Sequence, residues 1–224
     1  MERVGLNNLI AKGPLCSGCP LVDKGKGFCP DRVAKHTKYV LIGEAPGKNE
    51  IAKGEPFIGQ AGYVLDNWLL KAVATLQLAK ERGQVTYMNT LRCLPPEVQG
   101  RAYPKGDERK QAEAHCRQYD PDLTTAETVI LFGDSPQRCF FGTELDAEDA
   151  MDRQLGHDTR GVMGRVGRTY NRDGKRWVFA PHPAYILRQP ALVIHGQEAL
   201  KIAAGAHFVE PEYLSWEHAM GAFE

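Results

Sequence analysis

The stretch "YVLIGEAPGKNE", residues 39–50, decides the fold that we expect for this chain. It starts with an apolar run over residues 39–42, whose length and composition are typical of a buried β-strand. The run ends abruptly in "GEAPG", residues 43–47, where glycines permit a tight turn and Pro46 stiffens it. A carboxylate directly after a buried strand indicates either an ordinary turn or a turn that holds Glu44 over a ligand.

Apolar runs and amphipathic stretches alternate along the rest of the chain. We expect strands over residues 38–42, 85–91, 128–132 and 177–180. We expect helices over 62–78, 108–119 and 190–205, a short helix starting within 135–141, and a loop over 97–107. Strands that alternate with helices predict an α/β layered domain with a mainly parallel sheet.

Each expected strand ends next to glycine or polar residues. In open parallel sheets the functional loops lie beyond the carboxyl ends of the strands. These loops should therefore meet at one edge of the sheet. The residues concerned are Gly43 and Glu44, Asn89, Gly133 and Asp134, and His182.

The composition is that of an ordinary globular protein. The 224 residues, of which 42% are hydrophobic and 25% charged, suit one domain over residues 1–224. The 28 Lys and Arg balance the 28 Asp and Glu, which argues against a broadly basic nucleic-acid binder but leaves room for a local basic groove. No apolar run is long enough for a membrane span or a secretory signal. We expect a cytoplasmic monomer.

The cysteines suggest a metal centre. In a cytosolic chain of this size, thiolate–metal chemistry is a sharper interpretation than disulfides. Cys16 and Cys19 in "CSGC" have the spacing of a metal knuckle, and Cys93 and Cys116 would complete four thiolates. Zinc is the default ion for such a set, but an iron–sulfur cluster uses the same ligands, and spacing does not separate them. Inert buried thiols are the alternative, which suits Cys139 beside two phenylalanines.

Three further residues stand where they could meet a ligand. Phe57 lies in "GEPFIGQAG", residues 54–62, whose glycines allow close backbone approach. Asn89 offers one acceptor and two donors, which suits reading a base, and His182 is held between two prolines. Taken singly, a core phenylalanine, a turn asparagine and a structural histidine are the commoner explanations.

Residues 156–176 form a Gly- and Arg-rich stretch, "GHDTRGVMGRVGRTYNRDGKR". We expect a basic, flexible, hairpin-like insertion. It is either a solvated loop or a flap that contacts phosphates.

Several of these segments together resemble one known family. "GEAPGKNEIAKGEPFIGQAGYVLDNWL", "NTLRCLPP" and "HPAYILR", with the cysteines, resemble the family 4 uracil-DNA glycosylases, the iron–sulfur-containing members of the uracil-DNA glycosylase superfamily. The resemblance implies a three-layer α/β/α fold with a central four-stranded parallel sheet. It also implies hydrolysis of the N-glycosidic bond of deoxyuridine in DNA, which releases uracil and leaves an abasic site.

The resemblance assigns the catalytic roles to Glu44 and His182. Glu44 resembles the carboxylate that orients water or stabilises the sugar cation, and His182 resembles the donor to uracil O2. Arg188 resembles the residue that enters the duplex near the vacated position. Glu50 matches a motif acid to which we assign no separate role.

The base pocket follows from the same resemblance. Phe57 resembles the ring that stacks on the flipped uracil, and Asn89 resembles the reader of its edge. Gly43, Ala45 and Gly47 would provide backbone contacts to the substrate.

The resemblance also implies a structural 4Fe–4S cluster. Its ligands would be Cys16, Cys19, Cys93 and Cys116, with zinc as the alternative. The cluster would clamp an N-terminal arm, residues 1–37, onto the loop after the second strand. This would explain the arm's weak periodicity, because a metal rather than an apolar core would hold it.

Two features depart from the family pattern. The 22 residues between Cys93 and Cys116 exceed the usual interval, with the excess around 97–107, and Cys29 is an additional thiol that could compete as a ligand. One related branch traps its product through a histidine in this interval. None stands between Cys93 and Lys110, so ordinary hydrolysis is favoured.

Two alternative functions remain open at this stage. One is a non-catalytic DNA-binding relative, such as an accessory subunit of a replication or repair complex. The other is a zinc-clamped α/β domain of unrelated function.

Overall fold

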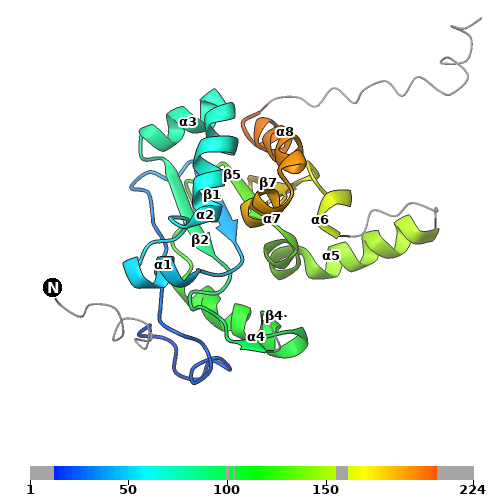
Figure 1. Cartoon of the computed structure of the whole chain (residues 1–224). Helices are drawn as coiled ribbons and strands as arrows, with labels where there is room; N and C mark the ends of the chain where they lie inside the picture. Colours follow the sequence, from blue (N-terminus) through cyan, green and yellow to red (C-terminus); the bar gives the residue numbers. More distant parts are fainter. Residues whose placement is uncertain (1–12, 99–100, 103, 155–160, 206–224) are drawn as a thin grey trace, which may run out of the picture.

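The computed structural model describes residues 13–98, 101–102, 104–154 and 161–205. Its centre is a five-stranded sheet in which four neighbouring strands are parallel and the fifth is antiparallel (Figure 1). Across the sheet the strands are β2 (Val85–Asn89), β1 (Tyr39–Gly43), β5 (Thr128–Phe132), β7 (Lys175–Ala180) and β6 (Thr169–Arg172). A separate two-stranded hairpin joins β3 (Glu97–Val98) and β4 (Arg101–Ala102).

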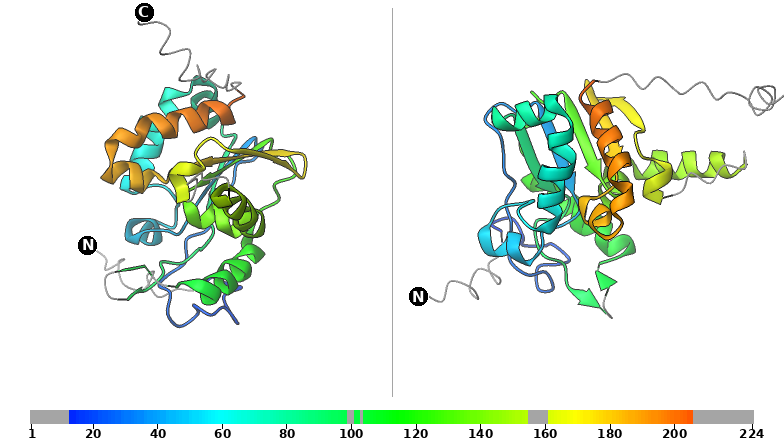
Figure 2. Two further views of the ribbon diagram at one scale, coloured as in Figure 1. Left: turned by 90° about the vertical axis from the view of Figure 1, so that its right-hand side faces the viewer. Right: turned by 45° about the horizontal axis from the view of Figure 1, so that its top comes forward.

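The parallel strands are apolar because both faces of the sheet are covered. Leu41 and Ile130 face one buried cluster, to which Val64 of the helical layer also belongs. Ile42 faces a second buried cluster on the opposite side, together with Phe141. Figure 2 shows the same layering, with α8 on one side of the sheet and α5 on the other. The expected α/β/α arrangement is therefore found.

The helices fill the connections between the strands. Within the described residues none is long and apolar enough to cross a lipid bilayer. They are α1 (Lys48–Lys53), α2 (Gln60–Val64), η1 (Leu65–Leu69), η2 (Leu70–Ala72), α3 (Ala74–Glu81), α4 (Gly106–Cys116), η3 (Arg117–Tyr119), α5 (Asp134–Gln154), α6 (Gly161–Gly164), α7 (Pro183–Arg188), η4 (Pro190–Leu192) and α8 (Val193–Ala203).

The prediction of a four-stranded sheet is wrong in its count. The four parallel strands are those expected, and β6 adds a fifth from within the supposed insertion, residues 156–176, of which 156–160 lie outside the described residues. Strand β6 lies at the sheet edge and is mostly exposed, so it carries no apolar run. Its signal is the turn to β7, where Asp173 and Gly174 both have positive φ, as Asp-Gly hairpin turns require.

Helix boundaries also differ from expectation. The single helix expected over 62–78 breaks at Val73, whose extended backbone (φ −125°) separates η2 from α3. Helix α5 continues through a kink at Phe141 to Gln154 instead of ending early. The expected loop over 97–107 contains the β3–β4 hairpin, and α1 and α7 were not expected. These helices are too short for a periodic pattern to indicate them.

The N-terminal arm, described from Gly13 onward, covers the edge of the sheet. Arg32 exchanges both backbone hydrogen bonds with Tyr87 of β2, at 2.9 and 3.0 Å. Farther along, Lys26 pairs in the same way with Leu94 in the loop after β2. The arm thereby satisfies backbone groups of an edge strand that would otherwise be open to another chain.

One close backbone approach fixes the start of the helical run after α1. A β-carbon added at Gly62 would lie 1.7 Å from the carbonyl oxygen of Phe57. Only glycine fits there without moving the loop that carries Phe57.

We therefore expect Gly62→Ala to lower the free energy of unfolding by about 1–3 kcal/mol, the usual range for overpacking. Gly59→Ala is the matched control, because no atom lies within 4 Å of its added β-carbon; its effect should stay within about 1 kcal/mol. Thermal unfolding of the two variants measures the difference. Equal melting temperatures would contradict the assignment of a backbone clash at Gly62.

Candidate active site

Gly43, Asn89 and Phe57 meet at the carboxyl edge of the sheet. Gly43 pairs with Asn89 in the register of β1 and β2. A β-carbon at Gly43 would lie 2.5 Å from Asn89 Oδ1 and 2.7 Å from Phe57 Cζ. Any larger residue at position 43 would therefore displace one of the two side chains.

Phe57 is held in a strained backbone conformation. Its φ of 58° falls in the left-handed region, which is unusual for a residue with a β-carbon. The ring is buried, with centroids 6.0 Å from Tyr87 and 6.4 Å from Phe132. Strain of this kind persists where the surroundings fix the residue, and it is concentrated at functional sites.

The loop after β1 places Glu44 against an arginine from α4. Arg109 Nη1 donates to Glu44 Oε1 at 2.8 Å, and its Nε donates to Glu113 Oε1 at 2.8 Å. The third guanidinium nitrogen, Nη2, donates to the hydroxyl of Ser135 in α5. Glu44 keeps 41% of its side chain exposed, so it is anchored at the wall of an open cleft of about 1240 Å³.

Glu50 has a structural role that the sequence left unassigned. Its carboxylate is buried and accepts a hydrogen bond of 2.6 Å from the backbone N–H of Gly47. An acid in the first turn that satisfies the N-terminal N–H stabilises a helix start. Glu50 therefore closes the 43–47 loop onto α1 and keeps Gly47 exposed at its tip.

His182 directly precedes α7 with a defined tautomer. The backbone N–H of Ala184 donates to His182 Nδ1 at 3.1 Å. Because an N–H can only donate, Nδ1 carries no proton, and the proton of the neutral ring lies on Nε2. Burial lowers the pKa of His182 to about 4; the Glu44 carboxylate opposes this shift and Arg188 adds to it. At neutral pH the residue is therefore an uncharged donor through Nε2.

His182 lies at the same sheet edge as Asn89 and Phe57, since a β-carbon on Gly133 would be 3.1 Å from the His182 Cβ. Two other expected site residues, Arg188 and Ala45, do not join this group. Arg188, at the end of α7, is exposed and influences His182 through its charge. Ala45 is half-buried and packs against the cluster that contains Cys93.

Four of the six cysteines surround one small pocket. Cys16 and Cys19 come from the arm, Cys93 from the loop after β2, and Cys116 from the end of α4. Cys29 is buried elsewhere, and its thiol donates to the carbonyl of Pro30. Within the described ranges, no three His, Cys, Asp or Glu side chains are grouped closely enough to hold a metal ion.

Comparisons with known proteins show which family this sequence matches. The sequence model of the Uracil DNA glycosylase superfamily matches residues 30–206. A type-4 uracil-DNA glycosylase of Thermotoga maritima is 31% identical over 77% of this chain and 78% of its own length. The type-4 enzyme of Pyrobaculum aerophilum is 26% identical over 94% of this chain and 99% of its own.

The chain belongs to the type-4 uracil-DNA glycosylase family.

Sequence reasoning missed a buried arginine in this type-4 chain. Arg92, next to Cys93, has only 2% of its side chain exposed. It donates to both carboxylate oxygens of Asp31 (3.2 and 2.8 Å), to Asp120 (2.7 Å) and to the carbonyl of Cys116 (3.1 Å). Arg92 thus ties the arm, the loop after β2 and the end of α4 together around the cysteine pocket. No spacing rule indicated it.

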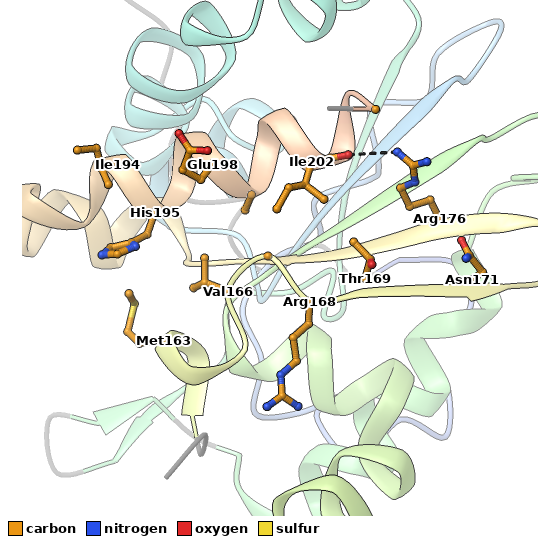
Figure 3. A pocket seen from close by; sticks show the side chains of 13 residues that line it. Met163, Val166, Arg168, Thr169, Asn171, Arg176, Ile194, His195, Glu198 and Ile202 are labelled. Atoms are coloured by element: carbon orange, nitrogen blue, oxygen red, sulfur yellow. Dashed lines mark hydrogen bonds between the residues drawn. The ribbon is translucent and has the colours of Figure 1, made fainter. Parts of the chain in front are cut away.

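A second cavity, of about 880 Å³, is separate from the candidate active site. Figure 3 shows Ile194, His195 and Ile202 of α8 on one side and Val166 and Arg168 on the other. None of the residues expected in the active site lines it.

The Arg92 network yields a stability prediction. Removing one partner of a buried ion pair leaves the other charge buried without compensation, so Arg92→Met should lower the free energy of unfolding by about 3–5 kcal/mol. Arg117→Met is the control, because Arg117 pairs with the same Asp120 but is 49% exposed, and should change it by about 1 kcal/mol or less. Thermal unfolding compares the two. A smaller loss for Arg92→Met than for Arg117→Met would contradict the role of Arg92.

Proposed function

We propose that this protein is a hydrolytic uracil-DNA glycosylase that cleaves the N-glycosidic bond of deoxyuridine in DNA. Uracil leaves, and an abasic site remains. Membership of the type-4 family supports this activity. The observation that carries the chemistry is the tautomer of His182, a neutral ring with its Nε2 proton available at the sheet edge.

Base recognition falls to Phe57 and Asn89. A base on which an enzyme acts must leave the stack and enter a pocket. The Phe57 ring offers a rigid surface for stacking, and the Asn89 amide next to it can read the hydrogen-bonding edge of uracil. Gly43, Ala45 and Gly47 would supply backbone contacts from the loop after β1.

His182 would stabilise the leaving group. Uracil departs as an anion with charge on O2, and a fixed hydrogen-bond donor lowers the energy of that state. A neutral imidazole donates through Nε2 without surrendering its proton. The lowered pKa of His182 keeps the ring in this form at neutral pH.

Glu44 would act on the other half of the reaction. The sugar becomes cation-like as the bond breaks, so a nearby carboxylate stabilises it or orients the attacking water. No nucleophilic side chain is required for this route. Arg188, exposed at the end of α7, would enter the duplex where uracil was removed.

A fluorescent duplex with one deoxyuridine tests the proposal. The wild type should release uracil and leave alkali-labile sites, and a thymine duplex should stay intact. His182→Ala should lower the single-turnover rate by about 100–1,000-fold, as for loss of a donor to a developing anion, and Asn89→Ala should lower it sharply as well. His195→Ala, a histidine outside the site, should retain the wild-type rate. Wild-type rates in both site variants would overturn these assignments.

The same assay separates the main alternative. A non-catalytic accessory subunit would bind DNA and release no uracil. The simultaneous presence of Glu44, Phe57, Asn89 and His182 at one sheet edge favours turnover.

We also propose that the four cysteines around the small pocket hold a structural 4Fe–4S cluster. The four thiols line one pocket, and four thiolates are the ligand set of a 4Fe–4S cluster as well as of zinc; the family resemblance favours the cluster. Burial raises the pKa of the Cys116 thiol to about 11, so a positively charged centre would be needed to hold it as a thiolate. The cluster would fasten the arm to α4 and take no redox part in excision.

Iron content and visible absorbance test the cluster. Anaerobically purified protein should be brown and contain about four irons per chain. Cys16→Ala, Cys19→Ala, Cys93→Ala and Cys116→Ala should each lower iron and absorbance, whereas Cys139→Ala should not. Retention of iron in Cys116→Ala with loss in Cys29→Ala would show that Cys29 is the ligand instead. Zinc without iron would contradict the cluster.

The remaining expectations stay predictions from the sequence. They are the single domain over 1–224, the monomeric state, the cytoplasmic location and a replication or repair protein as partner.

A further inference from the structure

We infer that Arg109 is the positioning residue of the catalytic carboxylate, and that it acts through Glu44. The inference rests on the proposed function and adds a residue to it. Arg109 stands 65 positions after Glu44, on a helix that carries none of the motifs quoted above apart from Cys116.

The three nitrogens of the Arg109 guanidinium have separate partners. They reach Glu44 in the loop after β1, Glu113 on the same helix, and Ser135 in α5. A planar guanidinium with its donors engaged in three directions is fixed in orientation, which the single ammonium of lysine does not reproduce. Arg109 therefore presents Nη1 to Glu44 at a set place.

The acceptors are themselves held in place. Ser135 Oγ donates to Glu113 Oε1 at 3.0 Å, and only 7% of the Glu113 side chain is exposed. The Thr90 hydroxyl donates to the backbone carbonyl of Glu44 at 2.9 Å and lies 3.3 Å from Glu113 Oε1. Both the backbone and the side chain of Glu44 are thus connected to one buried network.

Glu44 needs such an anchor because its side chain is 41% exposed. A long, half-exposed carboxylate would otherwise sample several rotamers and lose entropy on each turnover. Arg109 engages Oε1, and among the described residues no hydrogen bond engages Oε2. One oxygen is therefore anchored, and the other is available to water or to the sugar.

Pairing with Arg109 does not remove the negative charge that the reaction uses. The network contains two carboxylates, Glu44 and Glu113, and one guanidinium. Two carboxylates therefore share one guanidinium, and formal negative charge remains in excess within the network. Glu113 thus offsets the arginine, so that Glu44 is held firmly while the group as a whole still favours a positive sugar.

A double-mutant cycle in the uracil-release assay tests the inference. Arg109→Met should lower the single-turnover rate by about 100-fold, as misplacement of a catalytic group does, with little change in the Kd for DNA. In the Glu44→Gln background the same substitution should cost less than about twofold, because the group that Arg109 positions is already disabled. Arg109→Lys, which keeps the charge, should restore only part of the rate.

The control is Lys71→Met. Lys71 is exposed on η2 and does not line the cleft that holds Glu44, so this variant removes an equal charge and should keep the wild-type rate. Circular dichroism melts establish that the variants are folded, and Arg109→Lys serves if Arg109→Met is not.

The outcomes distinguish this inference from the proposed function. Absence of uracil release by the wild type would overturn both. Normal release by Arg109→Met, full activity of Arg109→Lys, or an equal loss in the wild-type and Glu44→Gln backgrounds would overturn the positioning role of Arg109 and leave the proposed function intact.

Discussion

The parallel pairing of β1 with both β2 and β5 is the constraint on which the rest of the structure depends. Because the three strands run in the same direction, the chain segments that follow them lie at one edge. The register then sets Gly43 opposite Asn89, and the missing side chain of Gly43 makes room for Phe57. The position of Phe57 beside Asn89 thus follows from strand order and one glycine.

Two opposite electrostatic environments lie at the carboxyl edge of the sheet. His182 is kept neutral by burial, and the backbone N–H of Ala184 directs its proton to Nε2. Glu44 belongs to a network with two carboxylates for one arginine. A neutral donor suits a base that leaves as an anion, and an excess of negative charge suits a sugar that becomes a cation. The proposed reaction, which uses these two environments, requires no side-chain nucleophile.

The sequence predicted the parts of the fold that arise from local apolar runs, and the parts of the site that lie in compact motifs. The four parallel strands and the meeting of Gly43 with Asn89 at one sheet edge belong to this class, whereas the place of Phe57 beside Asn89 was implied only by the family resemblance. Strand β6 was missed because an exposed edge strand has no apolar pattern. Arg92 and Arg109 were missed because the contacts that define their roles, to Asp31 and to Glu44, join residues 61 and 65 positions apart, which no local spacing encodes.

The state of the His182 ring tests the account most directly. Long-range nitrogen–proton NMR on ¹⁵N-labelled protein can assign each of the seven histidines and follow them with pH. The account predicts that His182 is neutral with its proton on Nε2 from pH 5.5 to 8, about the range where ordinary histidines titrate, with a midpoint of about 4. Binding of uracil with abasic DNA should shift its Nε2–H signal. A midpoint near the ordinary value of about 6.5, or a proton on Nδ1, would contradict the proposed mechanism.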